Sequence, residues 1–282
     1  MPEVDTRDSV DRSKRFQAEL PADAAKRDPA WRLLEQYAGI PADEVEAHLH
    51  RVRDQAWQIF PYGCIGRWRF LDLYIATLPQ YGELIARTQR GAVLLDCACC
   101  FGQALRQLAV DGAPAQNLVG LDLRREFVDL GYELFRDRGT FAARFVVGDM
   151  LDSGDARVGV LDGAVDVVHA ASFFHLFGWA DQVAIGARMV RFFRKGITDA
   201  VVLGRQIGSA VEPLDPEEHE KRGLGRYHHN QKSMQRLWDE IGRRTGTAWA
   251  VEAELATALE EDSNGEVAER TTIRFVVRQR AS

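Results

Sequence analysis

Hydrophobic positions in the first third of the chain recur at the spacing of an α-helix. Between residues 45 and 56 they are separated by four, three and four residues, which places them on one helical face. Pro41 and two acidic residues precede this run, as is typical of a helix start. After the turn-rich segment 61–66, a second amphipathic pattern predicts a helix over 68–78 that ends before Pro79.

From residue 91 the pattern changes to short apolar runs that alternate with helical segments. Continuous apolar strands joined by helices indicate an α/β fold with a doubly wound parallel sheet, covered on both faces. The last two strands flank the turn-like segment 260–266 and are expected to pair as an antiparallel hairpin. The expected strands are 92–97, 117–123, 143–150, 164–171, 199–208, 248–255 and 270–279. The expected helices are 102–110, 125–137, 179–196 and 230–244.

Composition and charge restrict the class of protein. The 282 residues are 46% hydrophobic and carry a net charge of −6, which is normal for a globular chain and argues against nucleic acid as the main partner. No apolar run approaches the roughly 20 residues of a membrane span, and the charged N-terminus lacks the apolar stretch of a signal peptide. We therefore expect a cytoplasmic protein with a small-molecule partner, built from a polar N-terminal arm (1–30), a helical region (31–90) and one α/β domain (91–282).

Four cysteines raise the question of a disulfide or metal site. Cys64 stands alone, whereas Cys97, Cys99 and Cys100 lie in the run LLDCACCFG. Neighbours this close do not pair readily, and the Cys-x-x-Cys spacing of a zinc site is missing. We expect no metal and interpret these cysteines as small residues of a strand-to-helix loop.

Acidic residues stand at the ends of the first three predicted strands. Asp96 ends the first, Asp122 the second and Asp149 the third. Ligands of such sheets bind at the carboxyl ends of the strands, where strand order reverses. A carboxylate at Asp122 is placed to accept both hydroxyls of a ribose, and Asp149 is placed to take an adenine amino group. These strand ends are predicted to form a nucleotide-type site.

Two cofactor classes compete for the loop after the first strand. The dinucleotide pattern Gly-x-Gly-x-x-Gly requires three glycines, and this chain has Ala98, Cys100 and Gln103 at those positions. The pattern acid-x-Gly-x-Gly-x-Gly of S-adenosylmethionine enzymes fits the register of Asp96, with Gly102 as its last glycine. A nicotinamide-dependent oxidoreductase and a catalytically silent binding protein remain open alternatives, as does the interpretation that the acids only cap helices.

The sequence between about residues 60 and 255 resembles class I S-adenosylmethionine-dependent methyltransferases. More narrowly, it is similar to a fungal secondary-metabolism group that O-methylates carboxylic acids in meroterpenoid pathways. The segments that carry the resemblance are PYGCIGRWRFLDLYI, LLDCACCFGQ, GAPAQNLVGLDL, REFVDLGYELFRDR, VDVVHAASFFHLFGW, GRQIG and RYHHN.

This resemblance implies a Rossmann-like sheet of seven strands, the last antiparallel, preceded by a helical N-terminal region. It implies S-adenosyl-L-methionine as cofactor and suggests a homodimer. One departure is Ala98, which stands where the family has a glycine and is strained if its φ is positive. The implied cofactor-binding residues are Asp96, Ala98, Cys100, Gly102, Gln103, Asp122, Leu123, Asp149, Met150 and Ala170.

The acceptor side of the site is predicted from what each acceptor chemistry needs. A carboxylate is already ionised at pH 7, whereas a phenol with a pKa near 10 needs a general base. A carboxylate acceptor therefore calls for hydrogen-bond donors, and Arg205 and Gln206 at the end of the fifth strand suit that role. Arg226, His228 and His229 in the following polar stretch are further candidates.

Aromatic residues and histidines after the fourth strand complete the predicted site. His175 is the candidate catalytic residue, either as a base or substrate contact or as a residue that fixes the loop. Phe173 and its aromatic neighbours are expected to wall an apolar substrate pocket, with Tyr62 and Arg67 of the helical region as substrate contacts in a lid. His169 lies inside a strand and is interpreted as a core residue. Other O, N or C methyl acceptors remain alternatives.

Overall fold

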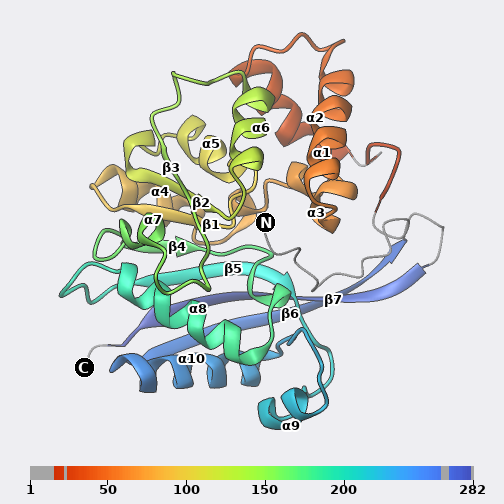
Figure 1. Cartoon of the computed structure of the whole chain (residues 1–282). Helices are drawn as coiled ribbons and strands as arrows, with labels where there is room; N and C mark the ends of the chain where they lie inside the picture. The colour runs from red at the N-terminus through yellow and green to blue at the C-terminus, as the bar shows by residue number, and fades with distance from the viewer. Residues whose placement is uncertain (1–15, 22–23, 262–266, 281–282) are drawn as a thin grey trace.

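A seven-stranded sheet with the strand order β3-β2-β1-β4-β5-β7-β6 runs through the molecule (Figure 1). The computed structural model describes residues 16–21, 24–261 and 267–280. Strands β1 to β5 pair in parallel, whereas β7 is antiparallel to both β5 and β6. The predicted fold class and its antiparallel last strand are confirmed. The strands are β1 (Leu94–Cys97), β2 (Leu118–Asp122), β3 (Arg144–Val147), β4 (Val167–His169), β5 (Val201–Ile207), β6 (Trp249–Glu261) and β7 (Val267–Gln279).

Strand order reverses between β1 and β4. The chain builds outward from β1 to β2 and β3, and then returns to place β4 on the other side of β1. The connections on the two sides lead away from each other, so a crevice opens at the carboxyl ends of these two strands. This crevice is where the sequence predicts the ligand.

Helices cover both faces of the sheet because successive residues of each strand point to opposite sides. Leu94 packs with the helices α4 and α5, and the next residue, Leu95, packs with α8 and α10. Figure 1 shows these two pairs on opposite sides of the strands. Along the described part of the chain, no helix has the length and apolar character needed to cross a membrane. The helices after residue 80 are α4 (Tyr81–Gln89), α5 (Gln103–Val110), α6 (Arg125–Phe135), α7 (Ala156–Gly159), α8 (Trp179–Phe192), α9 (Pro216–Lys221) and α10 (Gln231–Thr245), with the 3₁₀ turns η5 (Ala115–Asn117) and η6 (Phe174–Leu176).

The N-terminal region forms a separate hydrophobic cluster against α6. Phe101 of the loop after β1 and Phe127 of α6 belong to this cluster, together with buried residues of the N-terminal helices. The arm predicted over 1–30 overlaps the first helix, which begins at Ala24, while residues 1–15 and 22–23 lie outside the described residues. The elements of the region are α1 (Ala24–Arg32), the π-helix η2 (Leu33–Tyr37), α2 (Val45–Ile59), α3 (Gly63–Gly66), and the 3₁₀ turns η3 (Arg69–Leu71) and η4 (Tyr74–Thr77).

The helix predicted over 68–78 is wrong. Two left-handed residues, Trp68 with φ 59° and Leu73 with φ 38°, divide this segment into the short turns η3 and η4. The helix-like spacing of hydrophobic residues in this segment arises because its side chains pack into two different hydrophobic clusters. Trp68 is buried in the N-terminal cluster and Ile75 in the cluster under α4 and α5.

A buried ion pair joins three parts of the fold. The guanidinium of Arg106 in α5 has no exposed surface and donates to both oxygens of Asp137, at 2.6 and 2.8 Å. It also donates to the carbonyl of Phe101 at 2.7 Å. Tyr37 of the N-terminal region donates its hydroxyl to Asp137 at 2.8 Å, and burial together with this bond raises the pKa of Tyr37. Four aromatic rings surround the guanidinium, those of Tyr132, Phe135, Phe141 and Phe145.

We expect Asp137→Ala to lower the free energy of unfolding by about 3–5 kcal/mol, because it leaves the buried Arg106 charge without its partner. Asp129→Ala is the matched control, since Asp129 of α6 pairs with Arg138 at 2.8 Å on the surface and an exposed pair contributes at most about 1 kcal/mol. Urea denaturation followed by circular dichroism measures both. Equal losses for the two variants would contradict this account.

Candidate active site

A cavity of about 520 Å³ opens at the carboxyl ends of β1, β2, β4 and β5, within the range of about 300–1,000 Å³ typical of small-molecule sites. Residues between 60 and 75 and the start of β7 line its other side. The cavity therefore lies where the strand order reverses. The predicted site residues that line it are Tyr62, Arg67, Asp96, Ala98, Cys100, Gln103, Asp122, Leu123, Asp149, Met150, Phe173, His175, Arg205, Gln206 and Arg226.

Four predicted site residues do not line this cavity: Gly102, Ala170, His228 and His229. Gly102 lies behind the loop, where an added Cβ would come within 2.9 Å of Phe145 and of Arg106. Ala170 is completely buried under β5, and its neighbour Ala171 lines the cavity instead. His228 is half-buried behind His175, with ring centres 6.3 Å apart, and burial lowers its pKa.

The loop between β1 and α5 alternates in and out of the left-handed region. The φ angles are 60° at Ala98, 52° at Cys100 and 66° at Gly102, so each second residue turns the chain. The backbone amide of Cys99 donates to the carbonyl of Leu121 in β2 at 3.0 Å and fixes the loop to the sheet. Ala98 thus adopts the positive φ for which a glycine would be the unstrained residue.

We expect Ala98→Gly to raise the free energy of unfolding by about 0.5–1 kcal/mol. A left-handed L-residue costs about 1–2 kcal/mol, and the greater chain entropy of glycine offsets about 0.5–1 kcal/mol of that relief. Ala109→Gly in the regular part of α5 is the control and should destabilise by about 1 kcal/mol. Chemical denaturation measures both changes, and a destabilised Ala98→Gly protein would show that the loop carries no strain there.

Asp122 at the end of β2 is held by two backbone amides. Its carboxylate accepts from Cys100 N at 2.8 Å and from Arg124 N at 3.0 Å. Burial raises the pKa of Asp122, and the two amide bonds oppose that rise. Each carboxylate oxygen has a further lone pair, so Asp122 can accept ribose hydroxyls from the cavity that it lines.

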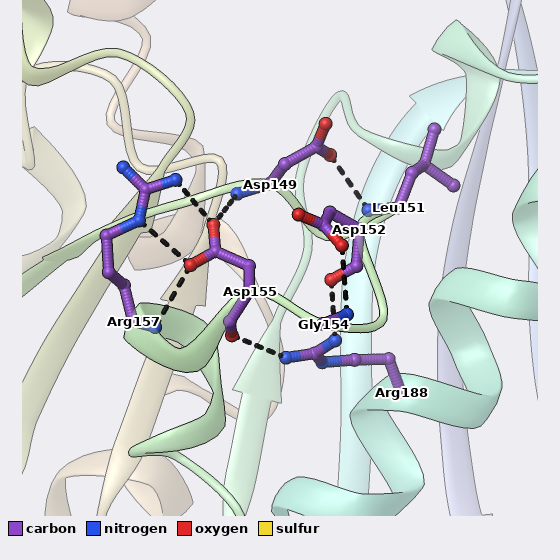
Figure 2. Close-up of polar contacts among 7 residues, drawn as sticks. All are labelled: Asp149, Leu151, Asp152, Gly154, Asp155, Arg157 and Arg188. Atoms are coloured by element: carbon purple, nitrogen blue, oxygen red, sulfur yellow. Dashed lines mark hydrogen bonds and ion pairs between the residues drawn. The ribbon is translucent and has the colours of Figure 1, made fainter.

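Asp149 is presented by a network of charged residues that follows β3 (Figure 2). Its side chain accepts from Leu151 N at 2.8 Å, and its backbone amide donates to Asp155 at 3.0 Å. Arg157 donates to both oxygens of Asp155, at 2.8 and 2.6 Å, and holds the pKa of that carboxyl well below its usual range. Arg188 of α8 donates to the carbonyl of Asp155 at 3.2 Å. These contacts fix the carboxylate of Asp149 at the cavity.

The histidines of the region divide into cavity residues and structural ones. His175 in η6 lines the cavity. His229, a candidate from its sequence position, uses both ring nitrogens in contacts with Gln182 at 2.8 Å and Ser233 at 3.1 Å. Burial lowers the pKa of His229 to about 3. His229 therefore acts as a neutral connection between α8 and α10.

The cysteines do not form a redox or metal site among the described residues. All four are free, and no group of three or more His, Cys, Asp or Glu residues is placed to hold a metal in this part of the chain. Burial raises the pKa of Cys64 to about 11 and that of the three loop cysteines well above the ordinary value. Cys97 and Cys99 are buried, whereas Cys64 and Cys100 are half-buried, and all but Cys97 line the cavity. The raised pKa keeps these thiols in their neutral, unreactive form at pH 7.

The sequence-based prediction of the site missed further residues that line the cavity, among them Arg69, Arg270 and His169. Arg270 lies at the start of β7, and the pairing of Ile207 with Thr272 brings that start to the carboxyl end of β5. An antiparallel last strand beside β5 would therefore have predicted that Arg270 lies near the site. Arg69 lies in the segment whose helix was predicted wrongly. His169 is buried as expected, but it also lines the cavity.

The residues present fit S-adenosylmethionine. Asp122 matches a ribose, and Asp149 matches the amino group of an adenine. The buried Oε1 of Gln103 and Nε2 of His169 line the cavity as polar atoms without a hydrogen-bond partner among the described residues. Unpaired buried acceptors of this kind suit a ligand that brings donors.

Comparisons with known proteins agree with this geometry. Residues 17–71 match the family described as "Meroterpenoid methyltransferase N-terminal domain", and residues 94–196 match "Methyltransferase domain". O-methyltransferase atr3 of Stereocaulon alpinum is 42% identical over 81% of this chain and 66% of that protein. O-methyltransferase phiE of a fungal species is 40% identical over 78% of this chain and 72% of that protein. Methyltransferase adrK of Penicillium roqueforti is 38% identical over 78% of each chain.

A solved structure shares the fold. The phosphoethanolamine N-methyltransferase 2 of Haemonchus contortus, in complex with phosphomonomethylethanolamine and S-adenosylhomocysteine, has a TM-score of 0.51 at 14% identity, over 82% of this chain and 61% of that one. The family decides between the two cofactor classes that the loop pattern left open. The chain belongs to the S-adenosylmethionine-dependent methyltransferases that carry the meroterpenoid methyltransferase N-terminal domain.

Proposed function

We propose that this methyltransferase esterifies the carboxylate of a hydrophobic, polyketide- or meroterpenoid-type aromatic acid in secondary metabolism. The observation that carries the proposal is the separation of charge in the cavity. The acids Asp96, Asp122 and Asp149 lie at the ends of β1 to β3, on the cofactor side. The opposite side, around β5, β7 and the N-terminal region, is lined by five arginines and one acid: Arg67, Arg69, Arg205, Arg226, Arg270 and Asp72.

Two guanidinium groups on the acceptor side share one carboxylate. Glu260 of β6 pairs with Arg69 at 2.6 Å and with Arg270 at 3.2 Å, so one carboxylate serves two guanidinium groups. Burial lowers the pKa of Arg270, and the neighbouring charges of Arg69 and Arg67 lower it further. A bound anion would relieve this crowding, which favours an acidic acceptor.

Gln206 supplies neutral donors at the same place. Its side chain is 2% exposed and lines the cavity, and neither its amide nitrogen nor its amide oxygen has a hydrogen-bond partner in the described part of the chain. An unpaired buried amide is costly. A carboxylate held by the amide N–H of Gln206 would satisfy the nitrogen, and the adjacent Arg205 would supply charge.

Aromatic rings form the apolar part of the cavity wall. Phe173 and Phe177, which follow β4, lie with ring centres 5.2 Å apart, and Phe60 and Tyr62 of the N-terminal region lie 4.3 Å apart. Tyr74 lies under the guanidinium of Arg205 at 5.0 Å. All five rings line the cavity. Such walls suit a large apolar acid with a few fixed polar groups, and they support a substrate-side role for the N-terminal region.

The main task of the protein in this reaction is to position the acceptor oxygen. When bound, S-adenosylmethionine would supply a methyl group attached to a positively charged sulfur. An oxygen lone pair of the acceptor would attack the methyl carbon in line with the carbon–sulfur bond, and S-adenosylhomocysteine would leave. A carboxylate has that lone pair at neutral pH and needs no general base. Arg205 and Gln206 then orient the acceptor, while His175 and the aromatic residues shape the cavity and exclude water.

Product analysis tests the proposal. The protein is incubated with methyl-labelled S-adenosylmethionine and a panel of prenylated or polyketide-type aromatic acids, and the product is identified by mass spectrometry and NMR. We expect a methyl ester that alkaline hydrolysis converts back to the acid. Label on a phenolic oxygen, a nitrogen or a ring carbon would overturn the carboxylate assignment.

We expect Gln206→Glu to lower kcat/KM for the acid by at least about 100-fold, because it places a second carboxylate next to the acceptor. Gln206→Leu, which removes the donor without adding charge, should lower it by about 10-fold. Gln58→Glu on the exposed face of α2 is the matched control. Calorimetric binding of S-adenosylhomocysteine should be unchanged in all three variants. Unchanged kcat/KM for both Gln206 variants would remove this residue from the acceptor site.

A further inference from the structure

A buried carboxylate–imidazole pair lies between the two central strands. Asp96 of β1 and His169 of β4 are directly opposite each other in the sheet, and the ring Nδ1 of His169 lies 2.7 Å from Asp96 Oδ1. The two residues are 4% and 3% exposed. Both line the cavity, so the pair forms part of its wall rather than a contact of the interior.

The other ring nitrogen of this pair is left without a partner. His169 Nε2 is buried, and no atom of the described residues (16–21, 24–261 and 267–280) forms a hydrogen bond with it. Because a carboxylate accepts, Nδ1 is the donating nitrogen, and in the tautomer that has its single proton on Nδ1 the other nitrogen, Nε2, carries a lone pair. An unsatisfied acceptor at a cavity wall calls for a donor on the ligand.

The position of the pair assigns it to one end of the cofactor. Asp122 on β2 and Asp149 after β3 belong to the ribose and adenine parts, and both lie on one side of β1. His169 lies on the other side of β1, on β4. The cofactor part that remains is the amino acid, whose ammonium group is a triple donor. Gln103 at the start of α5 adds a second buried acceptor, its Oε1.

We propose that His169 binds the α-ammonium group of S-adenosylmethionine through Nε2, and that Asp96 acts as the positioning residue that fixes the ring and its tautomer. This recognition concerns the cofactor alone. It therefore holds or fails independently of which acceptor the enzyme methylates.

The test compares two ligands that differ in the amino-acid end. S-adenosylhomocysteine carries the ammonium and carboxylate groups, whereas 5′-methylthioadenosine has the same nucleoside and sulfur without either. The unprotonated state of Nε2, tested below by NMR, distinguishes contact with the ammonium group from contact with the carboxylate. In His169→Asn the side-chain amide still reaches Asp96 as a donor, but the atom equivalent to Nε2 is gone. Isothermal titration calorimetry should show S-adenosylhomocysteine binding weakened by about 10- to 100-fold, with 5′-methylthioadenosine binding unchanged within about 2-fold.

Two control variants bracket this result. Asp122→Ala should weaken both ligands, because both contain the ribose. His48→Asn changes another buried histidine, which contacts the carbonyl of Leu134 at 3.0 Å away from the cavity, and should leave both affinities unchanged. Equal weakening of the two ligands by His169→Asn, or no weakening of either, would overturn the proposal.

A measurement on the unaltered protein covers the case in which His169→Asn fails to fold. With ¹⁵N-labelled histidine, the Nε2 signal of His169 should show an unprotonated nitrogen that shifts when S-adenosylhomocysteine binds and shifts much less with 5′-methylthioadenosine. The same shift with both ligands, or a protonated Nε2 that does not respond, would contradict ammonium recognition.

Discussion

The ion pair between Arg106 and Asp137 is the constraint on which the rest of the site depends. Arg106 holds the carbonyl of Phe101 and so fixes the end of the cofactor loop, while Asp137 fastens the turn after α6 and accepts the hydroxyl of Tyr37. One buried charge pair therefore couples the loop, the helix that follows β2, and the N-terminal region. Arg106 has no exposed surface and Asp137 is 4% exposed, so displacement of either partner would leave a buried charge unpaired.

The two walls of the cavity differ in charge and come from different parts of the fold. The sheet supplies the acidic wall that suits the cofactor, from the ends of β1, β2 and β3. The N-terminal region and the β6–β7 hairpin supply the basic and aromatic wall, and Glu260 links them through Arg69 and Arg270. Figure 1 shows this hairpin reaching toward the N-terminal helices. Under the proposed function, this arrangement would separate the ammonium-bearing cofactor from an acidic acceptor.

The positions of Asp96, Asp122 and Asp149 at one edge of the sheet could be predicted from the sequence because strand ends are local features. Their roles in cofactor binding stay a prediction. An apolar run that stops at an acid predicts both the strand and the edge at which Asp96, Asp122 and Asp149 meet. The acceptor side depends on segments far apart in the chain, and local patterns misled there. The helical spacing of Trp68 and Ile75 came from burial in two separate cores rather than from a helix.

The central claim is that the acceptor presents a carboxylate to the methyl group in the basic half of the cavity. The most direct measurement is a crystal structure of the protein with S-adenosylhomocysteine and an aromatic carboxylic acid that it methylates. The account predicts a carboxylate oxygen next to the cofactor sulfur and within hydrogen-bonding distance of the Gln206 amide. A complex in which a hydroxyl or ring carbon faces the sulfur, with the carboxylate turned away from Gln206 and Arg205, would contradict it.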